Sequence, residues 1–151
     1  MDTPEGKILD VGCGEGITTE KMGAIGLDLN RGTVKGSAYD IPFPDETFGA
    51  VTLLEVIEHL EEPEKAMVEI KRVLKPGGKI IMLFPNDWIF KIAWFLFGMC
   101  GEIFRDRGHL RQWTPRKAKE LLYGFMVMEG RSIPFKFWPV SLHHVIVWEK
   151  C

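Results

Sequence analysis

Three glycines spaced two residues apart follow a short apolar run near the start of the sequence. Residues 8–11 have the length and β-branched content of a buried strand, and the run stops at Gly12, Gly14 and Gly16. Because glycine has no Cβ, a ligand can lie against the backbone of such a turn, where N–H groups and the start of the next helix attract polar or negative groups. The spacing therefore predicts a cofactor-binding loop.

The second apolar run ends in a carboxylate. Residues 24–29 read as a buried strand, and Asp28 lies at its carboxyl end, where it can accept hydrogen bonds from both hydroxyls of a ribose. The dinucleotide fingerprint G-x-G-x-x-G/A fits poorly, because Gly16 comes one residue early and Ile17 takes the third position. The pattern favours a ribose-containing ligand and argues against a nicotinamide cofactor.

Ionisable side chains follow a third apolar run, residues 48–54, which reads as a fully buried strand. Ligands of open parallel sheets bind beyond the carboxyl ends of the strands, so Glu55, Glu58 and His59 are expected near the reacting groups. For His59 two roles stay open: bracing the next helix, or acting as a base or positioner of the acceptor.

An ordered series of motifs resembles class I S-adenosylmethionine-dependent methyltransferases, in their type 11 (UbiE-like) branch. The first glycine motif and the acidic motif of that family are followed by its later landmarks, and the order makes the resemblance specific. The motif-bearing stretches are residues 8–16, 26–30, 36–43, 56–60 and 72–78, and the resemblance is close from residue 7 to about 84.

The resemblance implies a Rossmann-like, doubly wound α/β fold. Its mostly parallel, seven-stranded sheet would have the order 3-2-1-4-5-7-6, with strand 7 antiparallel and helices on both faces, in a single domain over residues 1–151. A strand, a helix and a strand in sequence also predict a right-handed crossover in a parallel sheet. Beyond the runs already described, we expect a short helix at 17–23, a strand at 32–37, a helix from 63 that ends before 76–78, a strand at 79–84, a helix from 114–115 to about 124, and strands at 125–133 and 143–149.

The resemblance also implies S-adenosylmethionine as methyl donor and S-adenosylhomocysteine as product. Leu54 would offer its backbone carbonyl to the amino group of the donor, and the N–H of Ala38 would meet the adenine ring. Ser37 stands where the family usually has an acid or amide, so the adenine contact is expected to depend more on packing by Leu29 or Ile41. The expected cofactor-binding residues are Asp10, Gly12, Cys13, Gly14, Asp28, Leu29, Ser37, Ala38 and Leu54, with Asp40 as a further candidate.

Residues 88–100 are apolar on nearly every face, but they are too few to span a bilayer and Lys91 interrupts them. A core helix, a lid, an oligomer contact and shallow membrane attachment stay open. Core and lid are favoured because the resembling family builds its acceptor pocket after the fifth strand, and aromatic side chains suit an apolar acceptor. We therefore expect residues 88–113 to form an acceptor-side lid or insertion. The candidate catalytic residues are His59, Glu55 and His109, and Arg111 is a further acceptor-contacting candidate.

Composition restricts the partners of the chain. Hydrophobic residues make up 46%, charged residues 26%, and the net charge is -2, as in soluble globular proteins. Basic residues gather at 105–119 and read as a solvated face or a patch for an anionic ligand, without a clear nucleic-acid signature. Three distant cysteines and four histidines show no disulfide or metal-ligand spacing, so no metal is expected. The absence of an apolar leader predicts a cytoplasmic location.

The predicted function is transfer of a methyl group to an unidentified, small and partly apolar acceptor. The donor sulfonium is already an activated leaving group, so alignment is the main task, and a base is needed only if the acceptor keeps its proton until attack. The alternative is a methyltransferase-like binding module that holds the donor or a protein partner without turnover. Ser37, and a first strand that begins six residues into the sequence, keep this alternative open.

Overall fold

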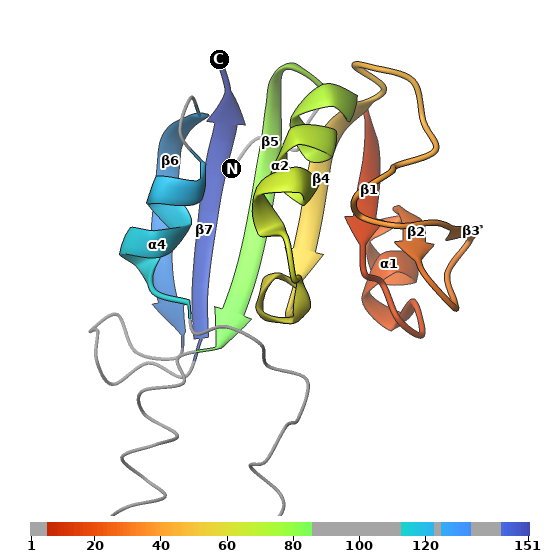
Figure 1. The fold of residues 1–151 in the computed structure, drawn as a ribbon, viewed down its shortest axis with the longest axis horizontal. Helices are drawn as coiled ribbons and strands as arrows, with labels where there is room; N and C mark the ends of the chain where they lie inside the picture. The colour runs from red at the N-terminus through yellow and green to blue at the C-terminus, as the bar shows by residue number, and fades with distance from the viewer. Residues whose placement is uncertain (1–5, 86–112, 123–124, 134–142) are drawn as a thin grey trace, which may run out of the picture.

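The apolar runs of the sequence form one mixed sheet of seven strands (Figure 1). The computed structural model describes residues 6–85, 113–122, 125–133 and 143–151. The predictions for His109, Arg111 and the stretch 88–112 lie outside these residues. The strands are β1 (Lys7–Val11), β2 (Ile25–Asp28), β3 (Val34–Lys35), β4 (Phe48–Leu54), β5 (Leu74–Pro85), β6 (Phe125–Ile133) and β7 (His143–Lys150).

The strand order is β3-β2-β1-β4-β5-β7-β6, as predicted. Strands β1 to β5 pair in parallel, whereas β7 runs antiparallel to both of its neighbours, β5 and β6. The carboxyl ends of the parallel strands therefore share one edge of the sheet. Because β7 runs the other way, its first residue, His143, reaches that same edge and lies opposite Pro85 of β5.

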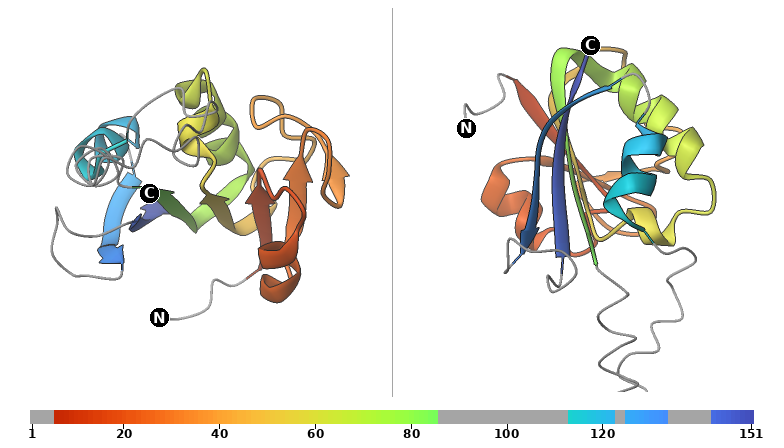
Figure 2. Two further views of the ribbon diagram at one scale, coloured as in Figure 1. Left: turned by 90° about the horizontal axis from the view of Figure 1, so that it is seen from below. Right: turned by 90° about the vertical axis from the view of Figure 1, so that its left-hand side faces the viewer.

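Helices cover both faces of the sheet, which confirms the prediction. Figure 2 shows α1 (Ile17–Met22) on one face, and α2 (Pro63–Val73) with α4 (Pro115–Leu121) on the other. Helix α1 is short because the glycine loop and Gly23 enclose it. The N-cap of α4 is Thr114, as predicted, and its hydroxyl accepts a hydrogen bond of 3.2 Å from the amide of Lys117. A single 3₁₀ turn, η1 (Ile57–His59), follows β4.

Two strand boundaries differ from the prediction. Strand β5 begins at Leu74 instead of residue 79, because Leu74 is already extended and pairs with Phe48 of β4. The proline and glycines that were expected to separate helix from strand lie inside β5, where Gly77 adopts a φ of 72°. Strand β3 is shorter than expected, because Gly32 at φ 86° precedes it and a turn at Ser37 follows it.

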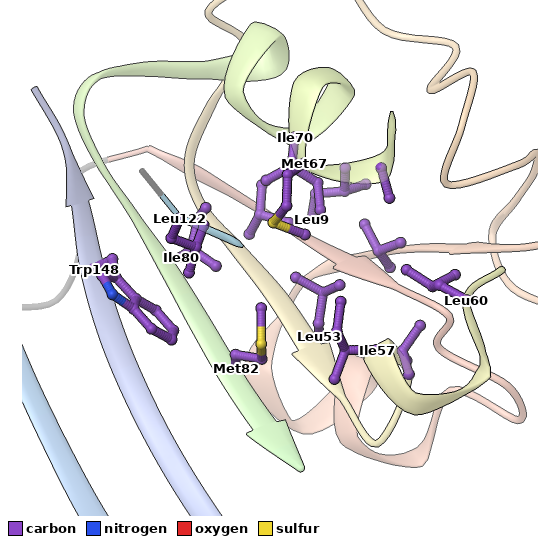
Figure 3. Close-up of a cluster of buried hydrophobic side chains, with 14 of the residues drawn as sticks. Leu9, Leu53, Ile57, Leu60, Met67, Ile70, Ile80, Met82, Leu122 and Trp148 are labelled. Atoms are coloured by element: carbon purple, nitrogen blue, oxygen red, sulfur yellow. The ribbon is translucent and has the colours of Figure 1, made fainter. Parts of the chain in front are cut away.

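Buried hydrophobic side chains pack between the sheet and α2 (Figure 3), and Ala118 of α4 and the adjoining Leu122 belong to the same cluster. Phe48–Leu53 of β4 are buried along their whole length, which explains the unbroken apolar run in the sequence. Trp113 was expected to end the acceptor-side lid, but it is 8% exposed and donates from Nε1 to the carbonyl of Ile57 at 3.1 Å. It is therefore a core residue that holds η1.

The connection between β3 and β4 is an irregular loop held by α2. Nη2 and Nη1 of Arg72 donate to the carbonyls of Ile41 at 2.9 Å and Phe43 at 2.8 Å. Glu69, one turn earlier, accepts from the amide of Ile41 at 2.9 Å and from Nη2 of Arg72 at 2.8 Å. The hydrogen bonds from Arg72 are the largest cause that holds the pKa of Glu69 below its ordinary value. Arg72 and Glu69 therefore form hydrogen bonds with loop backbone groups that regular secondary structure would otherwise satisfy.

Candidate functional site

The glycine loop is anchored at one end and open at the other. The amide of Gly12 donates to the carbonyl of Leu27 at 2.7 Å, and a Cβ at Gly12 would lie 2.6 Å from Cγ2 of Val56. A Cβ at Gly14 or Gly16 would meet no atom within 4 Å. Gly12 is thus required by internal packing, whereas Gly14 and Gly16 leave bare backbone beside open space.

The Asp28 carboxylate lies directly beside this open backbone. Its Oδ2 accepts a hydrogen bond of 3.1 Å from the amide of Gly14, and its Oδ1 accepts from the amides of Asn30 at 2.9 Å and Arg31 at 3.1 Å. These bonds, with that from Asn30 the largest cause, lower the pKa of Asp28 below its ordinary value of 3.8. The carboxylate is therefore ionised at neutral pH and fixed in orientation, and its remaining lone pairs can accept from hydroxyls.

Two apolar side chains flank the loop on the solvent side. Leu29, next to the carboxylate, is 70% exposed, and Ile17, at the start of α1, is 63% exposed. Ile41 was the other candidate for packing against adenine, but it is 2% exposed and belongs to the core. Leu29, and not Ile41, therefore offers an exposed apolar surface on which a flat base could lie.

Asp10 faces the interior of the protein. It is 3% exposed, and its carboxylate accepts hydrogen bonds from the hydroxyls of Thr19 at 2.5 Å and Thr52 at 2.6 Å. The three residues belong to β1, α1 and β4, so the carboxylate ties together the elements on either side of the glycine loop. Asp10 therefore braces the loop, and its predicted contact with the cofactor stays a prediction.

The Cys13 side chain also points inward, against two glycines. A Cβ at Gly26 or at Gly32 would lie 2.7 Å from its Sγ. Its amide donates to the carbonyl of Leu27 at 3.2 Å. Burial, aided by the Asp10 carboxylate, raises the pKa of the Cys13 thiol, so the thiol is neutral at physiological pH. The glycines at 26 and 32 are explained by this contact, which no local pattern in the sequence reveals.

Ser37 and Ala38 lie in the turn after β3. The hydroxyl of Ser37 accepts from the amide of Tyr39 at 3.1 Å, and the amide of Asp40 donates to the carbonyl of Ser37 at 3.2 Å. Ala38 is partly buried against the core, and Asp40 is exposed. The hydroxyl of Ser37 thus stabilises its own turn and keeps its donor capacity for a ligand.

The carboxyl end of β4 brings two ionisable side chains together. Glu55 adopts a φ of 57°, and its amide donates to the carbonyl of Leu83 at 2.9 Å. Its Oε1 lies 2.9 Å from Nε2 of His143, the first residue of β7. His143 was not among the predicted site residues. The antiparallel direction expected of the last strand was the signal that could have placed it at this edge.

The other predicted residues of this edge have different surroundings. Leu54 ends β4 and is partly buried. In η1, Glu58 is buried at 1% exposure, whereas His59 is exposed. Among the residues that the structure describes, no group of three or more histidines, cysteines and acids could hold a metal ion. None of the described helices has the length and apolar character required to cross a membrane.

A glycine loop after β1, an acid at the end of β2 and this strand order define a nucleoside-binding domain of the Rossmann-like methyltransferase class. Residues 9–82 match the family model described as "Methyltransferase domain". A protein of Encephalitozoon cuniculi named "Putative methyltransferase" is 37% identical over 143 aligned residues, which cover 85% of this chain and 67% of that protein. The chain therefore belongs to the S-adenosylmethionine-dependent methyltransferase family.

Further relatives agree with this assignment. Demethylmenaquinone methyltransferase of Renibacterium salmoninarum is 33% identical over 97 residues, which cover 52% of this chain and 41% of that protein. Across the first four curated relatives, the chain spans between 16% and 67% of their length.

Solved structures share the fold. A Thermotoga maritima S-adenosylmethionine-dependent methyltransferase, described as a possible histamine N-methyltransferase, superposes with a TM-score of 0.79 at 20% identity, covering 99% of this chain and 84% of that one. The [4+2]-cyclase SpnF superposes with a TM-score of 0.69 at 17% identity, covering 96% of this chain and 75% of that one. The same fold therefore occurs in a protein named as a cyclase and in one named as a methyltransferase, so the fold alone does not identify the acceptor.

Proposed function

We propose that the protein binds S-adenosylmethionine in the glycine loop and transfers its methyl group to a small, partly apolar acceptor. The observation that carries this proposal is the hydrogen bond between the Gly14 amide and the Asp28 carboxylate. This bond holds an ionised carboxylate, which can accept hydrogen bonds from a ligand, beside open backbone. Bare backbone and a fixed carboxylate at the ends of adjacent strands are what a nucleoside ligand requires.

The residues of the site fit the parts of this donor. Asp28 would hold the ribose hydroxyls, and the exposed Leu29 would cover one face of the adenine. The backbone at Gly14 and Gly16, where no side chain intervenes, would accommodate the polar methionine half. When bound, the donor supplies a methyl group on a sulfonium. The contribution of the protein is then to align the acceptor and to exclude water around it.

The names of relatives support an acceptor with an apolar or aromatic character. One curated relative is a demethylmenaquinone methyltransferase, and the name of one structural neighbour includes histamine N-methyltransferase. Both named acceptors contain an unsaturated ring. The aromatic residues of the stretch 88–100 in the sequence agree with such a ring. Reduced demethylmenaquinone and small phenols are therefore the first acceptors to test.

A binding module without turnover is the second candidate. The observation that favours it is Ser37, whose hydroxyl accepts a bond within its own turn where the family usually has an acid or amide for adenine. A weak adenine contact would leave ribose recognition as the main source of affinity. Such a module would bind the donor and its demethylated product without methylating any acceptor.

Two measurements separate these candidates. Isothermal titration calorimetry with S-adenosylmethionine and S-adenosylhomocysteine tests the donor site, and transfer of a radiolabelled methyl group to the acceptor panel tests turnover. Binding with transfer supports the enzyme, and binding without transfer to any acceptor supports the module. Absence of binding to both compounds would contradict both candidates.

A further inference from the structure

The contact between Glu55 and His143 joins two elements that are far apart in the sequence. Glu55 follows β4, and His143 begins β7, which reaches the carboxyl edge of the sheet only because it runs antiparallel. Oε1 of Glu55 lies 2.9 Å from Nε2 of His143. An ionised carboxylate can only accept a hydrogen bond, so Nε2 is the ring nitrogen that carries the proton. In the neutral ring, Nδ1 then keeps its lone pair and can take a proton from another group.

This pair lies close to the predicted donor site. Val56, the residue after Glu55, packs against Gly12. A Cβ added at Gly12 would lie 2.6 Å from Cγ2 of Val56. The side chains of His143 and Glu55 are 32% and 53% exposed, so a ligand at this edge can approach both. The pair is therefore next to the loop that would hold the donor and is accessible from outside.

The backbone on both sides of the contact is held in place. Glu55 has a left-handed φ of 57°, a conformation that costs energy in a residue other than glycine, and its amide is bonded to Leu83. On β7, the buried His144 follows His143, and its ring lies 5.6 Å from the ring of Phe84. Strain retained at an ionisable residue beside a ligand site is typical of a functional constraint.

We propose that His143 is the general base of the methyl transfer and that Glu55 is its positioning residue. This inference rests on the proposed function and specifies its acceptor class: a phenol or hydroquinone, whose reacting group keeps its proton until attack. The acceptor proton passes to Nδ1 of His143 as an electron pair of the acceptor forms the bond to the methyl carbon. The carbon–sulfur electron pair stays on sulfur, and the resulting imidazolium is stabilised by the Glu55 carboxylate.

In the described part of the chain, charged or titratable residues near the start of β7 include Glu55, His144, Glu58 of η1 and, on the adjacent strand β6, Arg131, which pairs with Val145. Beside Glu55, the adjacent residue His144 is titratable, and burial, with the neighbouring His143 a smaller cause, lowers the pKa of His144. The residues paired with the start of β7 are Pro85 on β5 and Ile133 on β6, and neither type carries a charge. Glu58, in η1 of the same edge, is the other acid to consider when a pH profile is interpreted.

The test compares His143→Asn and Glu55→Gln with wild type, using para-substituted phenols of graded acidity and a reduced naphthoquinone as acceptors. Glu120→Gln, an exposed acid that pairs with Arg116 on α4, serves as the control. Loss of a general base is expected to lower kcat by about 100-fold or more, and loss of its positioning residue by about 10-fold. The affinity for S-adenosylhomocysteine should change less than about twofold in all variants, because the general base acts on the acceptor and not on the donor.

Acceptor acidity and pH provide the decisive trend. The defect of His143→Asn should shrink as the phenol becomes more acidic or the pH rises, because an acceptor that is already ionised needs no base. A kcat of His143→Asn equal to that of wild type with every phenol would overturn the proposal.

A second readout does not depend on activity. In long-range ¹H–¹⁵N spectra of the ligand-free protein above pH 8, the His143 ring should carry its proton on Nε2, and this ring N–H should exchange faster with water in Glu55→Ala. A proton on Nδ1 would overturn the base role, even if methyl transfer is intact. If wild type binds the product but methylates no acceptor, the proposed function fails, and the base role fails with it.

Discussion

The amide of Gly14 donates a hydrogen bond of 3.1 Å to Oδ2 of Asp28, and this bond joins the loop after β1 to the carboxyl end of β2. Gly14 leaves room for a ligand, and Asp28 supplies a negative charge. Their bond lies in a loop and at the end of a strand, so substitution of either residue should change the site without unfolding the sheet.

Asp28→Ala should weaken binding of S-adenosylmethionine by about 1–3 kcal/mol, because it removes charge-assisted hydrogen bonds to the ribose. Titration calorimetry measures the change. Asp45→Ala is the matched control, since Asp45 is an exposed acid on the β3–β4 loop, 74% accessible, that pairs with Arg72. Equal affinity of Asp28→Ala and wild type would contradict the proposed place of the ribose.

Gly14→Val should prevent binding of the donor, because a branched side chain would fill the open space beside the loop. Gly23→Val is the control for backbone strain. Gly23 has a φ of 62°, close to the 54° of Gly14, and a Cβ there also meets no atom within 4 Å, but it caps the far end of α1. Both variants should lose similar stability, and only Gly14→Val should lose the calorimetric signal. A normal binding curve for Gly14→Val would refute the loop assignment.

Arg72→Ala should lower the free energy of unfolding by about 2–4 kcal/mol, because it removes the side-chain donor of two loop carbonyls and the cationic partner of the Glu69 carboxylate. Lys65→Ala on the same helix removes an exposed ion pair with Glu62 and should cost at most about 0.5 kcal/mol. Urea unfolding monitored by circular dichroism gives both values. Equal losses in the two variants would show that the loop does not depend on Arg72.

The same arginine predicts a pH dependence. The pKa of Glu69 in the folded protein lies below its ordinary value of 4.5, chiefly because of the hydrogen bonds from Arg72. The stabilisation from ionised Glu69 is therefore complete above about pH 4.5 and is lost as the pH falls through the folded-state pKa. The stability difference between wild type and Arg72→Ala should shrink over that acid range in urea titrations at stepped pH. A difference that stays constant to pH 3 would exclude this linkage.

Glu55→Gly and Glu46→Gly form a matched pair, because Glu55 and Glu46 both have left-handed φ values, 57° and 53°. Relief of backbone strain should raise the thermal stability of each variant, by up to about 1 kcal/mol. Only Glu55→Gly should lower kcat, by about 10-fold, since it also removes the partner of His143. If both variants retain full activity, the strain at Glu55 has no catalytic purpose.

The sequence was sufficient for most of the helices and strands and for the position of part of the candidate site in the fold. The unbroken apolar run of β4, the glycines after β1 and the acid at the end of β2 are local patterns, and each lies where it was expected. The resemblance added the strand order and the antiparallel last strand. The start of β5 was misplaced, because proline and glycines typical of a helix end lie within a strand that pairs with β4.

Partners of side chains were decided only by the tertiary structure. No spacing reveals that Cys13 packs against Gly26 and Gly32, or that Glu55 meets His143. Periodicity and turn chemistry report what neighbours along the chain need, and they act over a few residues. A contact between strand ends depends instead on register and direction across the whole sheet, so it exists only once every intervening strand is paired.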